Sequence, residues 1–152
     1  MPNIIFYLML LLAALPLHGD DLALSRDDEK GVRALLEAHY NAWNKHDTET
    51  MADLYTPDGD LRTTENKIGK NPKEIKAILS DQHSHLMKDA HIEGVIKSIQ
   101  LIKPDVVFVD AESTITGMKA LDKHNNSRLH HHVVFVLVKR EGQWKILIGR
   151  PF

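Results

Sequence analysis

The sequence contains no cysteine among its 152 residues. This absence excludes disulfide bonds, thiolate metal sites, a catalytic cysteine and a lipid anchor attached through cysteine. A surplus of basic residues is also missing, because 19 lysines and arginines stand against 21 aspartates and glutamates. Nucleic-acid-binding proteins normally carry such a surplus or a basic stripe, so we expect no nucleic-acid partner.

The short motifs that mark several enzyme classes are missing as well. The chain has no Gly-x-Gly-x-x-Gly for a dinucleotide, no Gly-x-x-x-x-Gly-Lys-Ser/Thr for phosphates and no Gly-x-Ser-x-Gly elbow. We therefore expect no cofactor. What remains is an ordinary globular composition, with 43 % hydrophobic and 26 % charged residues, in a chain long enough for one domain. Ten histidines are the one unusual feature.

The first residues resemble a secretory signal. The run from Ile4 to Leu17 is apolar and uncharged but shorter than the ~20 residues that a membrane-spanning helix needs. Pro16 ends it, and the small Gly19 precedes an expected cleavage site. This pattern predicts a signal peptide over residues 1–19, a flexible segment over 20–26 and a secreted or periplasmic protein that leaves the membrane after cleavage. The alternative is an uncleaved N-terminus buried in the core.

Capping residues and helical spacing predict three helices. Ser25 before an acidic turn indicates a helix that runs to about His46, and Asp47 caps a shorter second helix. The pair Asn71-Pro72 opens a third helix that continues towards Leu86. The apolar positions that define the first helix are Val32, Leu35, Leu36, Tyr40 and Trp43.

Extended segments follow each group of helices. Residues 56–59 (Thr-Pro-Asp-Gly) predict a turn, and residues 60–64 and 67–69 a small hairpin. A loop is expected around residues 124–126. Four long strands are predicted over His91–Ile102, Val106–Gly117, Arg128–Arg140 and Trp144–Arg150. Helices first and a run of strands after them indicate an α+β fold with the helices on one face of the sheet.

This order of elements is similar to the nuclear transport factor 2-like fold, also called SnoaL-like. The residues that carry the resemblance are Leu35-Leu36, Tyr40, Ala42-Trp43-Asn44, Asp47, Leu54-Tyr55, Pro57-Asp58-Gly59, Gly69, Ile75, Pro104-Asp105-Val106-Val107 and Gly142-Gln143-Trp144-Lys145-Ile146. The resemblance covers residues 27–152 and is nearest to the SgcJ/EcaC group. It implies a cone-shaped, curved antiparallel sheet with the N-terminal helices packed on its concave face, and a cavity for a ligand. The scaffold serves isomerases, dehydratases, cyclases and plain binding modules, so it implies no single chemistry.

Ketosteroid isomerase, which shares this fold, uses an aspartate base opposed by a tyrosine and a protonated aspartate. That arrangement of carboxyl groups is not visible in this sequence. Asp110 and Glu112 lie on one face of a predicted strand, opposite Val107, Val109 and Ala111. The apolar face is the one expected to be buried, so the two carboxylates are expected to face solvent.

Histidines are the other candidates for proton transfer, because an imidazole titrates near neutral pH. His83 and His85 end the third helix two residues apart, so only one can point into the cavity. His130 and His132 share a strand face, while His131 falls on the other face with Leu129, Val133, Phe135 and Leu137. Each of these histidines can instead be structural, and no spacing supports a metal site.

The sequence thus favours two hypotheses. The first is an acid–base enzyme of isomerase, dehydratase or hydrolase type that acts on a small apolar or amphipathic molecule. Its catalytic candidates are Tyr40, His85, His130 and His132, and its ligand-binding candidates are Trp43, Tyr55 and Arg150. The second is a non-catalytic ligand-binding or dimerisation module. Apolar residues on both faces of the strand 128–140 predict a homodimer in either case.

Overall fold

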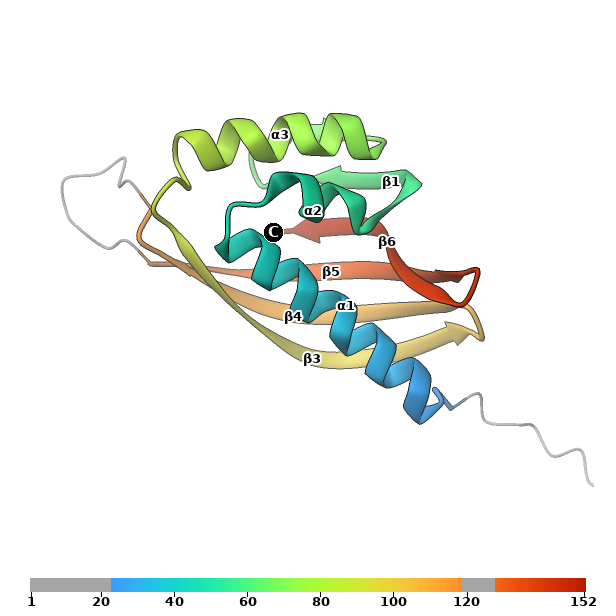
Figure 1. Cartoon of the computed structure of the whole chain (residues 1–152). Helices are drawn as coiled ribbons and strands as arrows, with labels where there is room; N and C mark the ends of the chain where they lie inside the picture. Colours follow the sequence, from blue (N-terminus) through green and yellow to red (C-terminus); the bar gives the residue numbers. More distant parts are fainter. Residues whose placement is uncertain (1–22, 119–127) are drawn as a thin grey trace, which may run out of the picture.

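The computed structural model describes residues 23–118 and 128–152 as one curved sheet with helices on one face (Figure 1). The predicted signal peptide and the predicted loop at residues 124–126 lie outside the described residues. The sheet has six strands in the order β2-β1-β6-β5-β4-β3. The strands are β1 (Tyr55–Arg62), β2 (Ile68–Gly69), β3 (His91–Lys103), β4 (Val106–Thr116), β5 (Arg128–Arg140) and β6 (Gln143–Pro151).

The three helices begin where their caps predict. Helix α1 (Arg26–Asn44) starts after Ser25, whose hydroxyl accepts a hydrogen bond from the Asp28 amide. Asp47 caps α2 (Thr48–Asp53) and Asn71 caps α3 (Pro72–Ser84) in the same way. Helix α3 ends at Ser84, short of the predicted Leu86, because the chain turns there and the Met87 amide donates to the Gln82 carbonyl.

The four predicted long strands are confirmed, but the sheet is mixed rather than wholly antiparallel. Strands β3 to β6 pair with their neighbours in antiparallel fashion, whereas β1 runs parallel to β6. The prediction was wrong on this point because the partner of β1 is the last strand of the chain. The direction of that pairing depends on how the whole chain folds back, and no local signal reports it.

The predicted turn at residues 56–59 is also wrong, since these residues lie inside β1. The pairing register with β6 shifts between Tyr55 and Asp60, so the intervening residues bulge out of the ladder. Pro57 has no amide hydrogen to donate, and an irregular edge of pairing is where a strand tolerates proline. The small hairpin that follows is confirmed, with Leu61 opposite Gly69.

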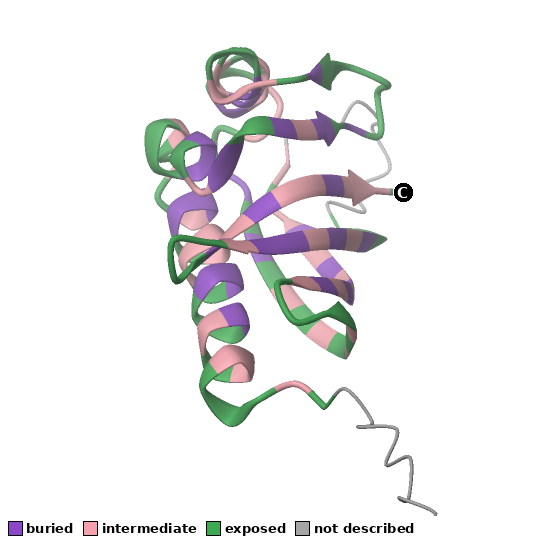
Figure 2. Ribbon diagram, turned by 90° about the vertical axis from the view of Figure 1, so that its right-hand side faces the viewer, coloured by how far each residue is buried: buried purple, intermediate pink, exposed green. Residues whose placement is uncertain are grey.

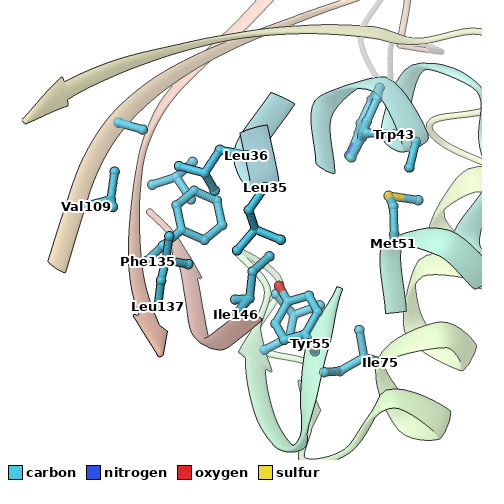
Figure 3. Packing of buried hydrophobic residues seen from close by; sticks show 14 of the residues in the cluster. Leu35, Leu36, Trp43, Met51, Tyr55, Ile75, Val109, Phe135, Leu137 and Ile146 are labelled. Atoms are coloured by element: carbon cyan, nitrogen blue, oxygen red, sulfur yellow. The ribbon is translucent and has the colours of Figure 1, made fainter. Parts of the chain in front are cut away.

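The core lies between α1 and one face of the sheet. Buried and less buried residues alternate along the strands of the sheet (Figure 2). On β4, Val107, Val109 and Ala111 are fully covered, as predicted. Side chains from α1, β5 and β6 meet in this layer (Figure 3). We call this covered side of the sheet the inner face and the opposite side the outer face. Towards one end of the inner face the packing leaves a cavity.

Candidate functional site

The cavity lies between α1, α3 and the inner face and has a volume of about 100 Å³. This is below the range of roughly 300–1,000 Å³ for drug-sized ligands and near the size that admits one small ring. No Asp, Glu, Lys or Arg is among the described residues that line it. Its polar lining residues are His39, Tyr40, Tyr55, Thr63, Thr64, Gln82, His83, Ser113 and His131. Such a cavity fits a small neutral molecule better than an ion.

Tyr40 is held in the cavity wall from two sides. A Cβ added to Gly94 of β3 would fall 2.0 Å from the Tyr40 ring, so only glycine leaves room for the ring there. The Tyr40 hydroxyl lies 3.3 Å from the Ser113 hydroxyl of β4. Just beyond, Asn44 fixes the end of α1 by exchanging two hydrogen bonds with the backbone of Ile92. Burial raises the pKa of Tyr40, which therefore stays a protonated hydrogen-bond donor at neutral pH.

Tyr55 and Trp43 form further parts of the wall. Tyr55 is 4 % exposed, and its hydroxyl points at Gly149 of β6, where an added Cβ would lie 2.6 Å away. Burial raises the pKa of Tyr55 as well, so its phenol also remains protonated. The Trp43 indole is almost as buried and contributes apolar surface.

Three histidines from three elements line the cavity, and burial keeps all of them neutral. Desolvation lowers the pKa of His83 on α3 to about 4, with a smaller contribution from the charge of His46. Desolvation also lowers the pKa of His39 on α1 to about 4, with His83 as the lesser cause. For His131 on β5 burial again lowers the pKa, helped by its two histidine neighbours. The buried Nδ1 atoms of His39 and His131 have no hydrogen-bond partner among the residues that the structure describes. Neutral imidazoles beside protonated phenols can accept and donate protons in one small space.

The structure brings some of the sequence-based candidates together and not others. Tyr40, Trp43 and Tyr55 line the cavity. Arg150 pairs with Asp60 and donates to two backbone carbonyls, and it is not among the lining residues.

The three histidines chosen from the sequence also lie elsewhere. His85 is exposed and contacts the Asp81 carbonyl. His130 lies on the outer face beside Thr114, and His132 stacks on the ring of Phe152. The cavity receives their neighbours His83 and His131 instead.

A signal for the histidines of the cavity was present in the pattern. His39 lies four residues before Trp43, on the buried side of α1, and His83 lies four residues after Leu79. His131 shares its face with Phe135 and Leu137, whose bulky side chains fill the core. Apolar character does not distinguish the two faces of β5, because the opposite face carries valines. The larger size of Phe135 and Leu137 is what marks the inner face.

Within residues 23–118 and 128–152, no three His, Asp or Glu side chains converge as ligands for a metal ion. In the same part of the chain, none of the helices combines the length and apolar character needed to cross a membrane.

The fold and its cavity define a nuclear transport factor 2-like domain of the cystatin-like type. Residues 32–148 match the family model of the SnoaL-like domain, and the chain belongs to this family. A search of curated proteins gave no match.

Solved structures agree with this fold. An uncharacterised cystatin-like protein from Caulobacter vibrioides is 22 % identical with a TM-score of 0.73, over 82 % of this chain and 88 % of that one. A ketosteroid isomerase-like protein from Erwinia carotovora atroseptica is 18 % identical with a TM-score of 0.64, over 82 % and 95 %. A protein of scytalone dehydratase type from Novosphingobium aromaticivorans is 14 % identical with a TM-score of 0.70, over 83 % and 85 %. Identities this low report the fold alone.

Proposed function

We propose that this SnoaL-like domain binds a small neutral molecule in its cavity and moves protons on it, as an isomerase or dehydratase does. The observation that carries the proposal is a set of neutral histidines facing protonated tyrosines in a cavity whose described lining holds no charged side chain. The similarity in fold to proteins of ketosteroid isomerase and scytalone dehydratase type supports the reaction class.

The roles follow from the chemistry of the groups. His83 or His131 accepts a proton from carbon next to a carbonyl, because a neutral imidazole has a ring nitrogen free to take a proton. Tyr40 or Tyr55 donates a hydrogen bond to the carbonyl oxygen, where negative charge develops as that proton leaves. No carboxylate among the described residues lines the cavity, so in this proposal histidine does the work that an aspartate does in ketosteroid isomerase.

Cyclohexanone is a suitable probe because it is neutral, has one ring and carries exchangeable protons next to a carbonyl. Binding is followed by tryptophan fluorescence, to which Trp43 in the cavity wall contributes. Turnover is followed by deuterium uptake into the probe in D₂O, measured by mass spectrometry. We expect binding to the wild type and deuterium uptake above the buffer rate. His83→Gln or His131→Gln should reduce that uptake by about tenfold or more.

Matched variants separate the cavity from the rest of the sheet. Ser113→Leu extends a larger side chain into the cavity and should abolish binding, whereas Thr114→Leu, on the outer face of the same strand, should not. Binding without deuterium uptake would favour the second function, a non-catalytic ligand-binding module. Absence of binding would contradict both.

We also propose a homodimer that forms through the outer face. Phe108 lies directly opposite Val136 on this face, with Val134 beside them, and Val95 of β3 is 57 % exposed. Asp110, opposite Val134, and Glu112, opposite Val95, lie on the same face. The proposed interface therefore combines apolar and charged residues, as many subunit interfaces do. The apolar run from Ile4 to Leu17 supports the further proposal of export. The sequence motifs that carry the SnoaL-like resemblance support the proposal that the chain belongs to the SgcJ/EcaC group.

A further inference from the structure

Two histidines from separate elements meet at the edge of the cavity. The Nδ1 atom of His46, in the turn after α1, lies 2.8 Å from the Nδ1 atom of His83, near the end of α3. The Trp43 ring contacts His83 edge-on, with ring centroids 4.6 Å apart. The C-terminal ends of α1 and α3 lie at the same end of the molecule (Figure 1). A hydrogen bond between two Nδ1 atoms requires that one of them carries a proton and the other does not.

The backbone directs His46 at α3. Its φ of +54° lies in the left-handed region, which residues other than glycine adopt rarely. The His46 amide donates to the Trp43 carbonyl, and its own carbonyl accepts from the Thr48 amide. A hydrogen bond of 2.9 Å between the Thr48 and Ser80 hydroxyls ties α2 to α3 beside the pair. The contact between the two rings is therefore supported by the surrounding turn.

The two rings differ in how well they can carry charge. His83 is 6 % exposed, and burial opposes an imidazolium there. His46 is only half-buried, so water can solvate a charge on its ring.

The other titratable groups nearby are few. His39 faces His83 from α1, and on α3 itself Asp81 is paired with Lys67, while His85 is exposed. Asp47, next to His46, caps α2 through Thr50. The two rings thus form a direct contact between the cavity, which His83 lines, and the protein surface, where His46 is partly exposed.

We propose that His46 and His83 form a proton relay between the cavity and solvent, which rests on the proposed acid–base function. In the base-ready state His83 carries its proton on Nδ1 and His46 carries its proton on Nε2. When His83 Nε2 takes a proton from the ligand, the Nδ1 proton of His83 passes to Nδ1 of His46. One proton has entered and the pair has gained one positive charge, which resides on His46. The reverse steps return a proton to the ligand. His46 is a positioning residue here, because it touches no ligand and acts through His83.

Nitrogen NMR of the histidine rings tests the relay on the full chain without any ligand. We expect a through-bond coupling between the two Nδ1 atoms. The spectra are recorded from pH 8 to pH 5. Over the same pH range His83 should stay neutral but move its proton from Nδ1 to Nε2. Two unconnected rings would not show this coordinated change of tautomer.

Two variants provide the comparison. In His46→Gln, His83 should keep one tautomer throughout the range, while His85→Gln, two residues from His83 and exposed, should leave the coordinated change intact. If His83 keeps one tautomer in the wild type, or if a chelator changes the ring signals because the pair holds a metal ion, the relay is refuted.

The cyclohexanone assay adds a separate readout. The His46→Gln variant should bind the probe as the wild type does but take up deuterium at least tenfold more slowly. Its pH profile for uptake should also change shape. If the wild type binds no probe, the proposed function fails while the NMR result still decides the relay. If the wild type takes up deuterium and the His46→Gln variant takes it up at the same rate, the relay is overturned.

Discussion

Lowering the pH from 8 to 5 should destabilise this fold through its buried histidines. His39 and His83 each have a pKa of about 4 in the folded chain, against about 6.5 for an unperturbed histidine. A group whose folded pKa is depressed binds more protons in the unfolded chain, so stability rises with pH. The contribution is fully present above about pH 6.5 and is lost as the pH falls towards 4.

The magnitude follows from the two pKa values. At pH 5 an unfolded histidine is almost fully protonated, whereas His39 and His83 remain largely neutral in the folded chain. Integrating proton uptake from pH 8 to pH 5 gives about 2 kcal/mol for each histidine, or about 4 kcal/mol for both. His131 adds to this loss, because its pKa is also lowered. A loss of this size is a large part of the roughly 5–15 kcal/mol that stabilises a typical domain.

Urea unfolding at pH 8, 6 and 5, followed by tryptophan fluorescence, measures the effect directly. The variant His39→Phe is the sharpest comparison, since within residues 23–118 and 128–152 the buried Nδ1 atom of His39 has no hydrogen-bond partner to lose. It should remove about half of the pH dependence, or about 2 kcal/mol. The variant His85→Gln should retain all of it because the His85 ring is exposed.

Carboxylates do not contribute to the loss of stability between pH 8 and pH 5. The lowered pKa values of Asp28, Glu74 and Asp81 make their contribution disappear only at more acidic pH. The reasoning would be refuted if the free energies of unfolding at pH 8 and pH 5 differed by less than about 1 kcal/mol. It would also be refuted if His39→Phe left the pH dependence unchanged.

Two further variants test the cavity wall and the outer face. Gly94→Ala should displace the Tyr40 ring, since the added Cβ would fall within 2.0 Å of it, and lower the free energy of unfolding by about 1–3 kcal/mol. Urea unfolding measures this cost. Ser98→Ala, on the same strand, is a suitable control. Gly142→Ala is not, because Gly142 has a positive φ. Val95→Lys places a charge in the proposed dimer interface and should convert a dimer to a monomer in native mass spectrometry. A monomeric wild type, or a dimer that tolerates the lysine, would argue against that interface.

Local features of the sequence were enough to predict the helices and the long strands. Ser25, Asp47 and Asn71 cap the helices because their side chains reach backbone amides within three residues. The alternation of β4 predicts its buried face because side chains on a strand point to opposite sides in turn. Both signals depend only on neighbours in the chain, so they do not change with the tertiary contacts of the rest of the molecule.

The tertiary structure decided what the sequence left open. Tyr40, Trp43 and Tyr55 were placed in the cavity wall by the helical pattern and the resemblance, but the histidines were not. On β5 both faces are apolar, and the larger side chains of Phe135 and Leu137 were the one local signal that the face of His131 is the inner one. His46 and His83 are far apart in the chain, and no periodicity brings them within hydrogen-bond distance.

The sequence by itself therefore determined where the helices begin, where the four long strands lie, which family the chain resembles and which apolar positions fill the core. The tertiary structure alone decided that β1 runs parallel to β6 and that His46 lies against His83. The physical reason is that caps and periodicity are local. The partner of a strand and the covered face of a sheet depend instead on contacts between segments distant in the chain.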